Sequence, residues 1–244
     1  MALLAAPCAA IAGDEKDRPA APAAPATPEV LLAPFDGDPA GDATKADAAA
    51  QALLASGDAA GAAARWMDLC DKDSVALLPV PPASGAAGLW WPAREVALLR
   101  LGDLPTAGQA AVEARWGGHA AALVAEALAG AIEPLERAAR EAPTTDAGGR
   151  ALIALADRDA EEGNAERAAS RLSRWLAMNR RAPPERRAAV GLRLLDARSL
   201  MGDELGLSLA LRALLDVAEI PVRRGNESTT IARRAPEAVI ELRA

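Results

Sequence analysis

Apolar residues recur every three or four positions along most of the chain between Thr44 and residue 219. Val190, Leu194, Ala197 and Met201 are spaced by four, three and four, which places them on one side of an α-helix. The same spacing before and after Gly163 and after Gly202 predicts further helices with one buried face. The positions expected on those faces are Leu152, Leu155, Ala156, Ala165, Ala168, Ala169, Leu172, Leu176, Leu207, Ala210, Leu211, Leu214, Leu215 and Ala218.

A recurring Gly-Asp or Gly-Asn pair interrupts this helical pattern and predicts compact turns between helices. Glycine accepts the left-handed conformation that ends a helix, and Asp or Asn accepts backbone N–H bonds at the start of the next one. Ala62 and Ala168 each lie five residues after the glycine, where a small side chain lets two helices cross closely, and Trp66 and Leu172 follow one turn later. The pairs are Gly57-Asp58, Gly163-Asn164 and Gly202-Asp203, with a less certain copy at Gly102-Asp103.

These features predict an all-α fold of degenerate tetratricopeptide-like helical hairpins, an α-solenoid, over residues 42–219. We expect the repeats to be degenerate because the turns are unevenly spaced along the chain. Residues 74–91 break the pattern as a short β-hairpin-like insertion, in which we expect one of Trp90 and Trp91 to be buried and the other exposed, because neighbours in a strand point to opposite faces. Residues 220–244 are expected to form an irregular tail with short extended stretches.

The first 41 residues differ from the helical region. Residues 1–12 are small and apolar, and Ala10-Ile11-Ala12 has the form of a signal-peptidase site, although a basic n-region is missing; we expect the remnant of a signal peptide and hence export to the periplasm or cell envelope. Residues 13–41 are rich in Pro and Ala and predict a disordered linker. No segment predicts a transmembrane span.

Composition limits the kinds of partner. Apolar residues make up 51% of the chain but aromatic residues only 2%, which suits closely packed Ala/Leu helices. The net charge of −7 argues against general affinity for nucleic acid. Residues 164–193 are locally basic, with eight arginines against two glutamates, and Arg167, Arg171 and Arg174 are spaced to share one helix face. This face is either a docking surface for an acidic partner or an ordinary solvated face.

Candidate chemistry is sparse, and the sequence predicts no catalytic, metal or cofactor site. His119 is the sole histidine; it follows two glycines, which predicts a helix start, and it has no second His or paired Cys to form a site. The acidic stretch from Asp157 to Glu162 lacks the spacing of a calcium loop and is expected to be a solvated face among arginines. Cys70 is expected to be a buried apolar thiol.

The order of several short phrases resembles the tetratricopeptide-like helical region that precedes a quinoprotein-like (PQQ-binding-like) β-propeller in certain exported bacterial proteins. The resemblance implies export and a scaffold role. It implies no catalytic residue and no cofactor, because residues up to Ala244 contain no series of blade-like strands. The phrases lie at Ala50–Trp66, Leu77–Val80, Gly88–Arg94, Leu104-Pro105, Ala114-Arg115, Thr144–Leu172 and Ile220–Gly225.

We therefore expect a non-enzymatic helical-repeat scaffold that mediates protein–protein interaction in the bacterial cell envelope. The candidate partner-binding residues are Trp90 and Trp91 and the arginine face Arg167, Arg171 and Arg174. The exposed tryptophan either anchors a partner or caps the neighbouring helices. One alternative is a truncated or split accessory domain whose partner is a separately encoded β-propeller protein. A second alternative is a cell-wall-acting enzyme with a carboxylate site that the sequence does not single out.

Overall fold

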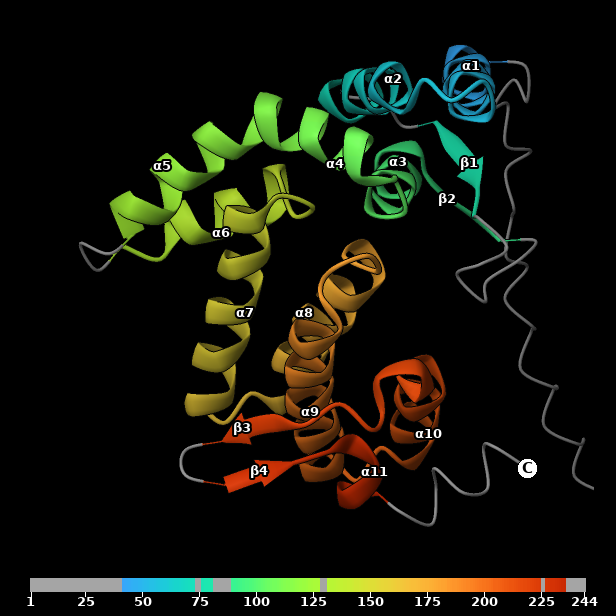
Figure 1. The fold of residues 1–244 in the computed structure, drawn as a ribbon. Coiled ribbons are helices and arrows are strands. Elements are labelled where there is room, and N and C mark those ends of the chain that lie inside the picture. The colour runs from blue at the N-terminus through green and yellow to red at the C-terminus, as the bar shows by residue number, and fades with distance from the viewer. Residues whose placement is uncertain (1–40, 73–75, 81–88, 128–130, 225–226, 236–244) are drawn as a thin grey trace, which may run out of the picture. The chain divides into compact units, whose positions relative to one another are not determined.

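The computed structural model describes residues 41–72, 76–80, 89–127, 131–224 and 227–235, and this part of the chain is mostly α-helical (Figure 1). Consecutive helices pack against one another, as α1 does on α2, α7 on α8 and α8 on α9. The helices are α1 (Asp42–Ala55), α2 (Ala59–Asp71), α3 (Ala93–Gly102), α4 (Thr106–Val112), α5 (Gly118–Ala127), α6 (Glu133–Glu141), α7 (Asp146–Glu161), α8 (Ala165–Met178), α9 (Pro184–Leu200), α10 (Glu204–Ala213) and α11 (Ile231–Arg234).

Three helical hairpins turn at glycines with positive φ. Gly57, Gly163 and Gly202 have φ values of 91°, 80° and 65°, and they join α1 to α2, α7 to α8 and α9 to α10. The residue after each glycine begins the next helix with a side-chain cap. These caps are Asp58 accepting from the Gly61 N–H (2.8 Å), Asn164 from the Arg167 N–H (3.2 Å) and Asp203 from the Gly206 N–H (2.8 Å).

Replacing Gly163 with alanine is expected to lower the free energy of unfolding by about 1 kcal/mol, because alanine is strained at positive φ. Gly118 is the matched control: its φ is −63°, and a Cβ added there meets nothing within 4 Å. Gly118→Ala should raise the free energy of unfolding by about 0.5–1 kcal/mol. Urea denaturation followed by circular dichroism measures both, and effects of the same sign would contradict the turn assignment.

Gly102 does not follow the pattern of the other turns. It is the last residue of α3, and positive φ among the described glycines is confined to positions 57, 163 and 202. Its importance is steric instead: a Cβ at this position would lie 2.2 Å from the carbonyl oxygen of Met178, at the end of α8. Glycine therefore permits direct backbone contact between α3 and α8.

Helices α4 and α5 form one continuous helical path, joined by the π-helical turn η3 (Glu113–Gly117). Backbone angles on either side of the turn are helical, with φ/ψ of −61°/−48° at Val112 and −63°/−43° at Gly118. His119 lies in the first turn of α5, at a helix start as predicted, although the two glycines before it belong to the continuous helical path. One extra residue in the turn keeps the ladder of hydrogen bonds intact, so the glycines do not end the helix.

Buried apolar side chains form two main cores. The N-terminal core contains residues of α1–α4 and strand β1, with Trp66 as its largest fully buried member. The C-terminal core draws on α5–α11, with Trp175 as its largest. Met178 at the end of α8 belongs to the N-terminal core, so α8 contributes side chains to both. The contact of Gly102 with Met178 joins α3 to α8 at one of the places where the two cores meet.

Two short antiparallel hairpins accompany the helices (Figure 1). Strand β1 (Leu77–Pro79) pairs with β2 (Trp90–Pro92), which ends one residue beyond the predicted insertion. Strand β3 (Val222–Arg224) pairs with β4 (Glu227–Thr229), and α11 follows. Residues 222–235 are thus more regular than the expected irregular tail, because Ile231 reaches the C-terminal core and gives this segment a buried anchor. The expected leader, linker and final extended stretch (1–40 and 236–244) lie outside the described residues.

Candidate interaction surfaces

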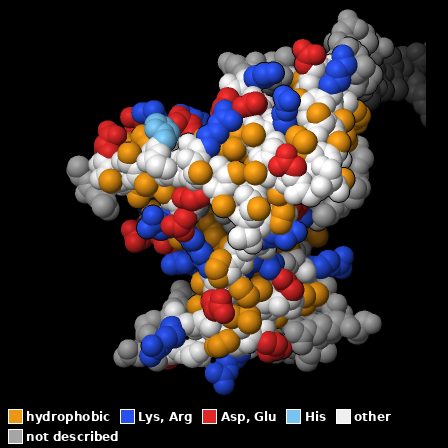
Figure 2. Space-filling model, turned by 45° about the horizontal axis from the view of Figure 1, so that its top comes forward, with side chains coloured by type: hydrophobic (Ala, Val, Ile, Leu, Met, Phe, Trp, Pro, Cys, Tyr) orange, Lys and Arg blue, Asp and Glu red, His pale blue; other side chains and the backbone are white. Residues whose placement is uncertain are grey.

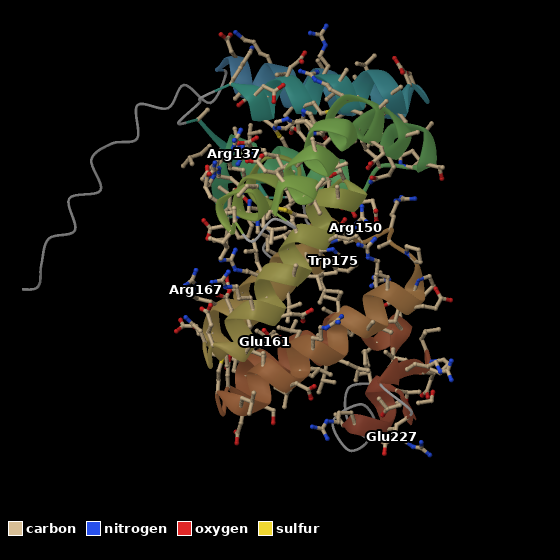
Figure 3. All side chains as sticks on the ribbon, turned by 90° about the vertical axis from the view of Figure 1, so that its left-hand side faces the viewer. Arg137, Arg150, Glu161, Arg167, Trp175 and Glu227 are labelled. Carbon is tan, nitrogen blue, oxygen red and sulfur yellow. The ribbon has the colours of Figure 1, made fainter. Side chains whose placement is uncertain are left out.

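The predicted arginine face of α8 is tied to acids of neighbouring helices. Arg171 donates to Asp159 of α7 at 2.6 Å, and Arg167 lies 3.6 Å from the other oxygen of the same carboxylate. Arg174 donates to Glu95 of α3 at 2.9 Å. Figure 3 shows Arg167 at the edge of the helical layer and Trp175 within it. The three arginines share a face, as the spacing predicts, but that face is turned toward acidic side chains of this chain.

The rest of the basic stretch is paired in the same way. Of its eight arginines, Arg181 is the one for which the described residues provide no ion pair, and the local charge of +6 in sequence is largely compensated in space. Figure 2 shows one face of the molecule, on which basic and acidic side chains are interspersed. The remaining pairs are Arg180–Asp103 (3.6 Å), Arg186–Asp146 (2.6 Å), Arg187–Asp216 (2.5 Å) and Arg193–Asp157 (3.1 Å).

The acidic stretch Asp157–Glu162 supplies several of these partners. Asp157 pairs with Arg193, Asp159 with Arg171, and Glu162 with Arg158 at 2.8 Å. Asp159 is buried, so its charge is held by the two arginines in place of water. Within the described ranges, no three His, Cys, Asp or Glu side chains lie close enough together to hold a metal ion.

His119 lies on α5 and faces the end of α6. Its Nε2 is 3.1 Å from a carboxylate oxygen of Glu141, and both side chains are partly exposed. Burial raises the pKa of Glu141, but the hydrogen bond with His119 and the charge of Arg137 outweigh it, so the pKa lies below its usual value. This pair links two neighbouring helices.

Cys70 lies at the end of α2 inside the N-terminal core. Burial raises the pKa of its thiol to about 12, opposed by the nearby Arg94. A protonated thiol shielded from solvent is a poor nucleophile. The structure places Cys70 as a packing residue.

We expect the Cys70 thiol to resist labelling in the folded protein. The test uses a Cys8→Ser variant at pH 8 and an aromatic disulfide reagent, with free glutathione as the reference thiol. Cys70 should stay unmodified over the time in which glutathione reacts completely, because almost no Cys70 thiolate forms. The same sample in guanidinium should release one equivalent of product. Rapid native modification would contradict the burial of this residue.

A groove with a volume of about 390 Å³ lies between α4, the loop before α7 and the loop before α9. Its two carboxylates are held by donors of the chain: Glu113 accepts from the Asp146 N–H (3.1 Å), and Asp146 accepts from Arg186 (2.6 Å). Thr144 is buried there, and its hydroxyl has no hydrogen-bond partner among the described residues. The groove is open to solvent, and its two carboxylates bind donors of the chain itself.

Trp90 and Trp91 are both exposed, at 53% and 40%, so the expectation of one buried indole is wrong. The reason lies in the size of the sheet. The inward positions are filled by Leu78 of β1, by Val80 directly after β1 and by Ala93 directly after β2, all buried. Among the described residues, this sheet of two three-residue strands has no second layer that covers Trp90 or Trp91. Both tryptophans are therefore presented at the surface, next to exposed Leu89.

A second apolar surface was not singled out from the sequence. Leu200 at the end of α9, Met201 in the turn, and Leu205 and Leu209 on α10 are exposed by 81%, 37%, 73% and 58%. We call these four residues the leucine face. The spacing predicts Met201 on the buried side of α9, and this is wrong. Met201 is the C-cap residue, one position beyond the end of α9, where the helical periodicity no longer determines the direction of the side chain.

No family model, curated protein or solved structure matches this chain. The described helices include none that is both long and apolar enough to cross a membrane. What the structure itself defines is a mostly helical protein with two apolar surfaces and an arginine-rich segment that is paired internally. The tetratricopeptide-like character and the likeness to a propeller-associated region stay predictions.

Proposed function

We propose that this chain is a non-enzymatic scaffold that binds a protein partner in the bacterial cell envelope, with Trp90 and Trp91 as its anchor. The observation that carries the proposal is the exposure of two adjacent indoles in a protein with very few aromatic residues. Tryptophan is the side chain most enriched where binding energy concentrates in protein interfaces. The proposed location in the envelope rests on the leader-like residues 1–12.

The base of the hairpin presents these indoles on a fixed backbone. Leu78 and Trp91 are opposite each other in the strand register, and Leu78 is fully buried. The Val80 N–H donates to the Leu89 carbonyl at 2.9 Å, and the Ala93 N–H donates to the Ala76 carbonyl at 2.8 Å. A fixed backbone lowers the entropy cost of ordering the anchor on binding.

The strands themselves point to the chemistry of the partner. Pro79 and Pro92 are in β1 and β2 and have no N–H to offer, which disfavours addition of a further strand. Binding then takes place through the side chains. The partner that fits is a protein with an apolar pocket that accepts an indole ring.

The internal pairing of the arginines also supports binding through the apolar anchor. If Arg167, Arg171 and Arg174 are occupied by Asp159 and Glu95, little uncompensated charge is left on that face to attract an acidic partner. We expect binding to depend on the apolar anchor and to change little with salt, since screening weakens exposed charge pairs and not apolar contacts.

Site-specific photo-crosslinking tests the proposal. A photoreactive phenylalanine analogue at position 91 should form a discrete adduct with one envelope protein in the cells that produce this chain. Position 49, an exposed alanine on α1, is the control and should give no such adduct. Absence of an adduct at positions 90 and 91, or the same adduct at position 49, would overturn the proposal.

A further inference from the structure

The groove beside α4 is formed by three parts of the chain that are distant in the sequence, and its volume of about 390 Å³ is in the range of small-molecule sites. Its lining combines apolar and polar side chains. Ala110 of α4, Met178 at the end of α8 and Pro183 directly before α9 supply apolar surface. The polar groups among them therefore determine which kind of ligand the groove can bind.

The two carboxylates of the groove already have donors within the chain. Glu113 accepts from the Asp146 N–H at 3.1 Å and so caps the start of α7. Asp146 pairs with Arg186 at 2.6 Å and with Arg150 at 3.2 Å. A cationic ligand would have to displace these donors, so the groove is poorly suited to a cation.

Arg181 lines the same groove and differs from the other charged groups there. Its side chain is exposed, and the part of the chain that the structure describes provides no carboxylate for it. A guanidinium group stays positively charged and binds a carboxylate through two parallel N–H donors. The charge that remains available to a ligand in this groove is thus positive.

Two neutral side chains add hydrogen-bonding groups to the lining. Gln109 donates through Nε2 to the Leu101 carbonyl at 2.7 Å, which leaves its amide oxygen as an acceptor. Thr144 is only 7% exposed, and its hydroxyl has no partner among the described residues. Few buried hydroxyls stay unpaired, which indicates that a group from outside the chain completes the bonding of Thr144.

We propose that this groove binds the C-terminal end of a short peptide, with the peptide carboxylate on Arg181 and the adjacent amide N–H on the oxygen of Gln109. The groove favours a single negative charge, because a phosphate dianion would lie near Glu113 and Asp146. This site is independent of the partner proposed to bind the exposed tryptophans. Since Arg181 is exposed, we expect weak binding, with a dissociation constant on the order of 1 mM.

Titration of the isotope-labelled full chain, followed by two-dimensional NMR, tests the proposal. The probes are N-acetyl-alanyl-alanine, the same dipeptide with a C-terminal amide, and inorganic phosphate, each from about 0.1 to 10 mM. The free acid should shift the backbone N–H signals of Thr144 and Ala182. The amide and phosphate should bind at least about tenfold more weakly, because neither presents a single carboxylate to Arg181.

Variants assign the roles of the two side chains. Arg181→Gln should weaken binding of the free acid about tenfold. Arg212→Gln is the matched control, because Arg212 is an exposed arginine on α10 that has no ion pair among the described residues, and it should bind like the parent. Thr144→Val should weaken binding about fivefold. It should not lower the melting temperature, because the hydroxyl has no partner within the described structure to lose.

Several results would overturn the proposal. One is the absence of any shift with the free acid, and another is equal affinity for the acid and the amide, which would show that the carboxylate is not recognised. Phosphate that binds more tightly than the peptide would replace the ligand class. Unchanged binding by Arg181→Gln would contradict the role of this arginine, and a lower melting temperature of Thr144→Val would show that its hydroxyl serves the fold.

Discussion

Replacing Trp66 with alanine should lower the free energy of unfolding by about 3–5 kcal/mol, the usual cost of removing a large buried aromatic side chain. Trp66 is 1% exposed and is the largest fully buried side chain of the N-terminal core. Its indole N–H donates to the buried carboxylate of Asp47 at 2.8 Å. The substitution therefore leaves a cavity and also removes a donor from a buried acceptor.

Two variants separate these contributions. Trp66→Phe keeps most of the apolar volume but loses the N–H, and it should cost about 1–3 kcal/mol. Asp47 would then keep its bond from Gln51 at 2.6 Å and its ion pair with Arg100 at 3.4 Å. Trp90→Ala is the control for the loss of an exposed indole, with an effect within about 0.5 kcal/mol. Urea denaturation measures all three, and similar losses for Trp66→Ala and Trp90→Ala would contradict the structure.

Replacing Asp159 with alanine should cost about 3 kcal/mol, because it removes a buried carboxylate and leaves Arg171 without its closest partner. Asp159 is buried between α7 and α8, and Arg171 is only 20% exposed. Its other acid, Glu136, is 3.8 Å away and does not replace the 2.6 Å bond. The same substitution at exposed Glu161, two residues along the helix, should have little effect.

The two arginines on Asp159 provide an internal comparison. Arg167 is more than half exposed and lies farther from the carboxylate, so Arg167→Ala should change the free energy of unfolding by less than about 1 kcal/mol. Arg171→Ala should approach the cost of Asp159→Ala. If Arg171→Ala were as mild as Arg167→Ala, the arginine face would be a solvated surface and the internal pairing would be wrong.

The parts of the fold that the sequence predicts are those governed by local rules. Gly57, Gly163 and Gly202 adopt a backbone conformation that few other residues tolerate, so each is visible as a turn without knowledge of the rest of the chain. Gly102-Asp103 looks like a fourth copy of the turn in the sequence. Glycine is needed at position 102 for a different reason, which is the close contact with the backbone of Met178, a residue distant in the sequence.

The candidate site was less predictable because its determinants are distant in the chain. Arg174 pairs with Glu95, 79 residues earlier, and no local pattern reveals that this arginine is occupied. The sequence singles out Trp90 and Trp91, but their exposure depends on the rest of the fold, because no second layer covers the small sheet among the described residues. The leucine face was missed because its spacing also fits a buried helix face, and periodicity alone does not show which side of a helix is covered.

We propose that this protein binds its partner through Trp90 and Trp91 and not through its arginine-rich helix. The most direct measurement is affinity capture from the envelope fraction of the producing organism, at low and high salt, with the parent chain, Trp90→Ala/Trp91→Ala and Arg167→Ala compared. We expect one stoichiometric partner that is retained at high salt, still bound by Arg167→Ala and lost when both tryptophans are replaced. A partner that is released by salt and by Arg167→Ala, yet kept by the tryptophan variant, would contradict it.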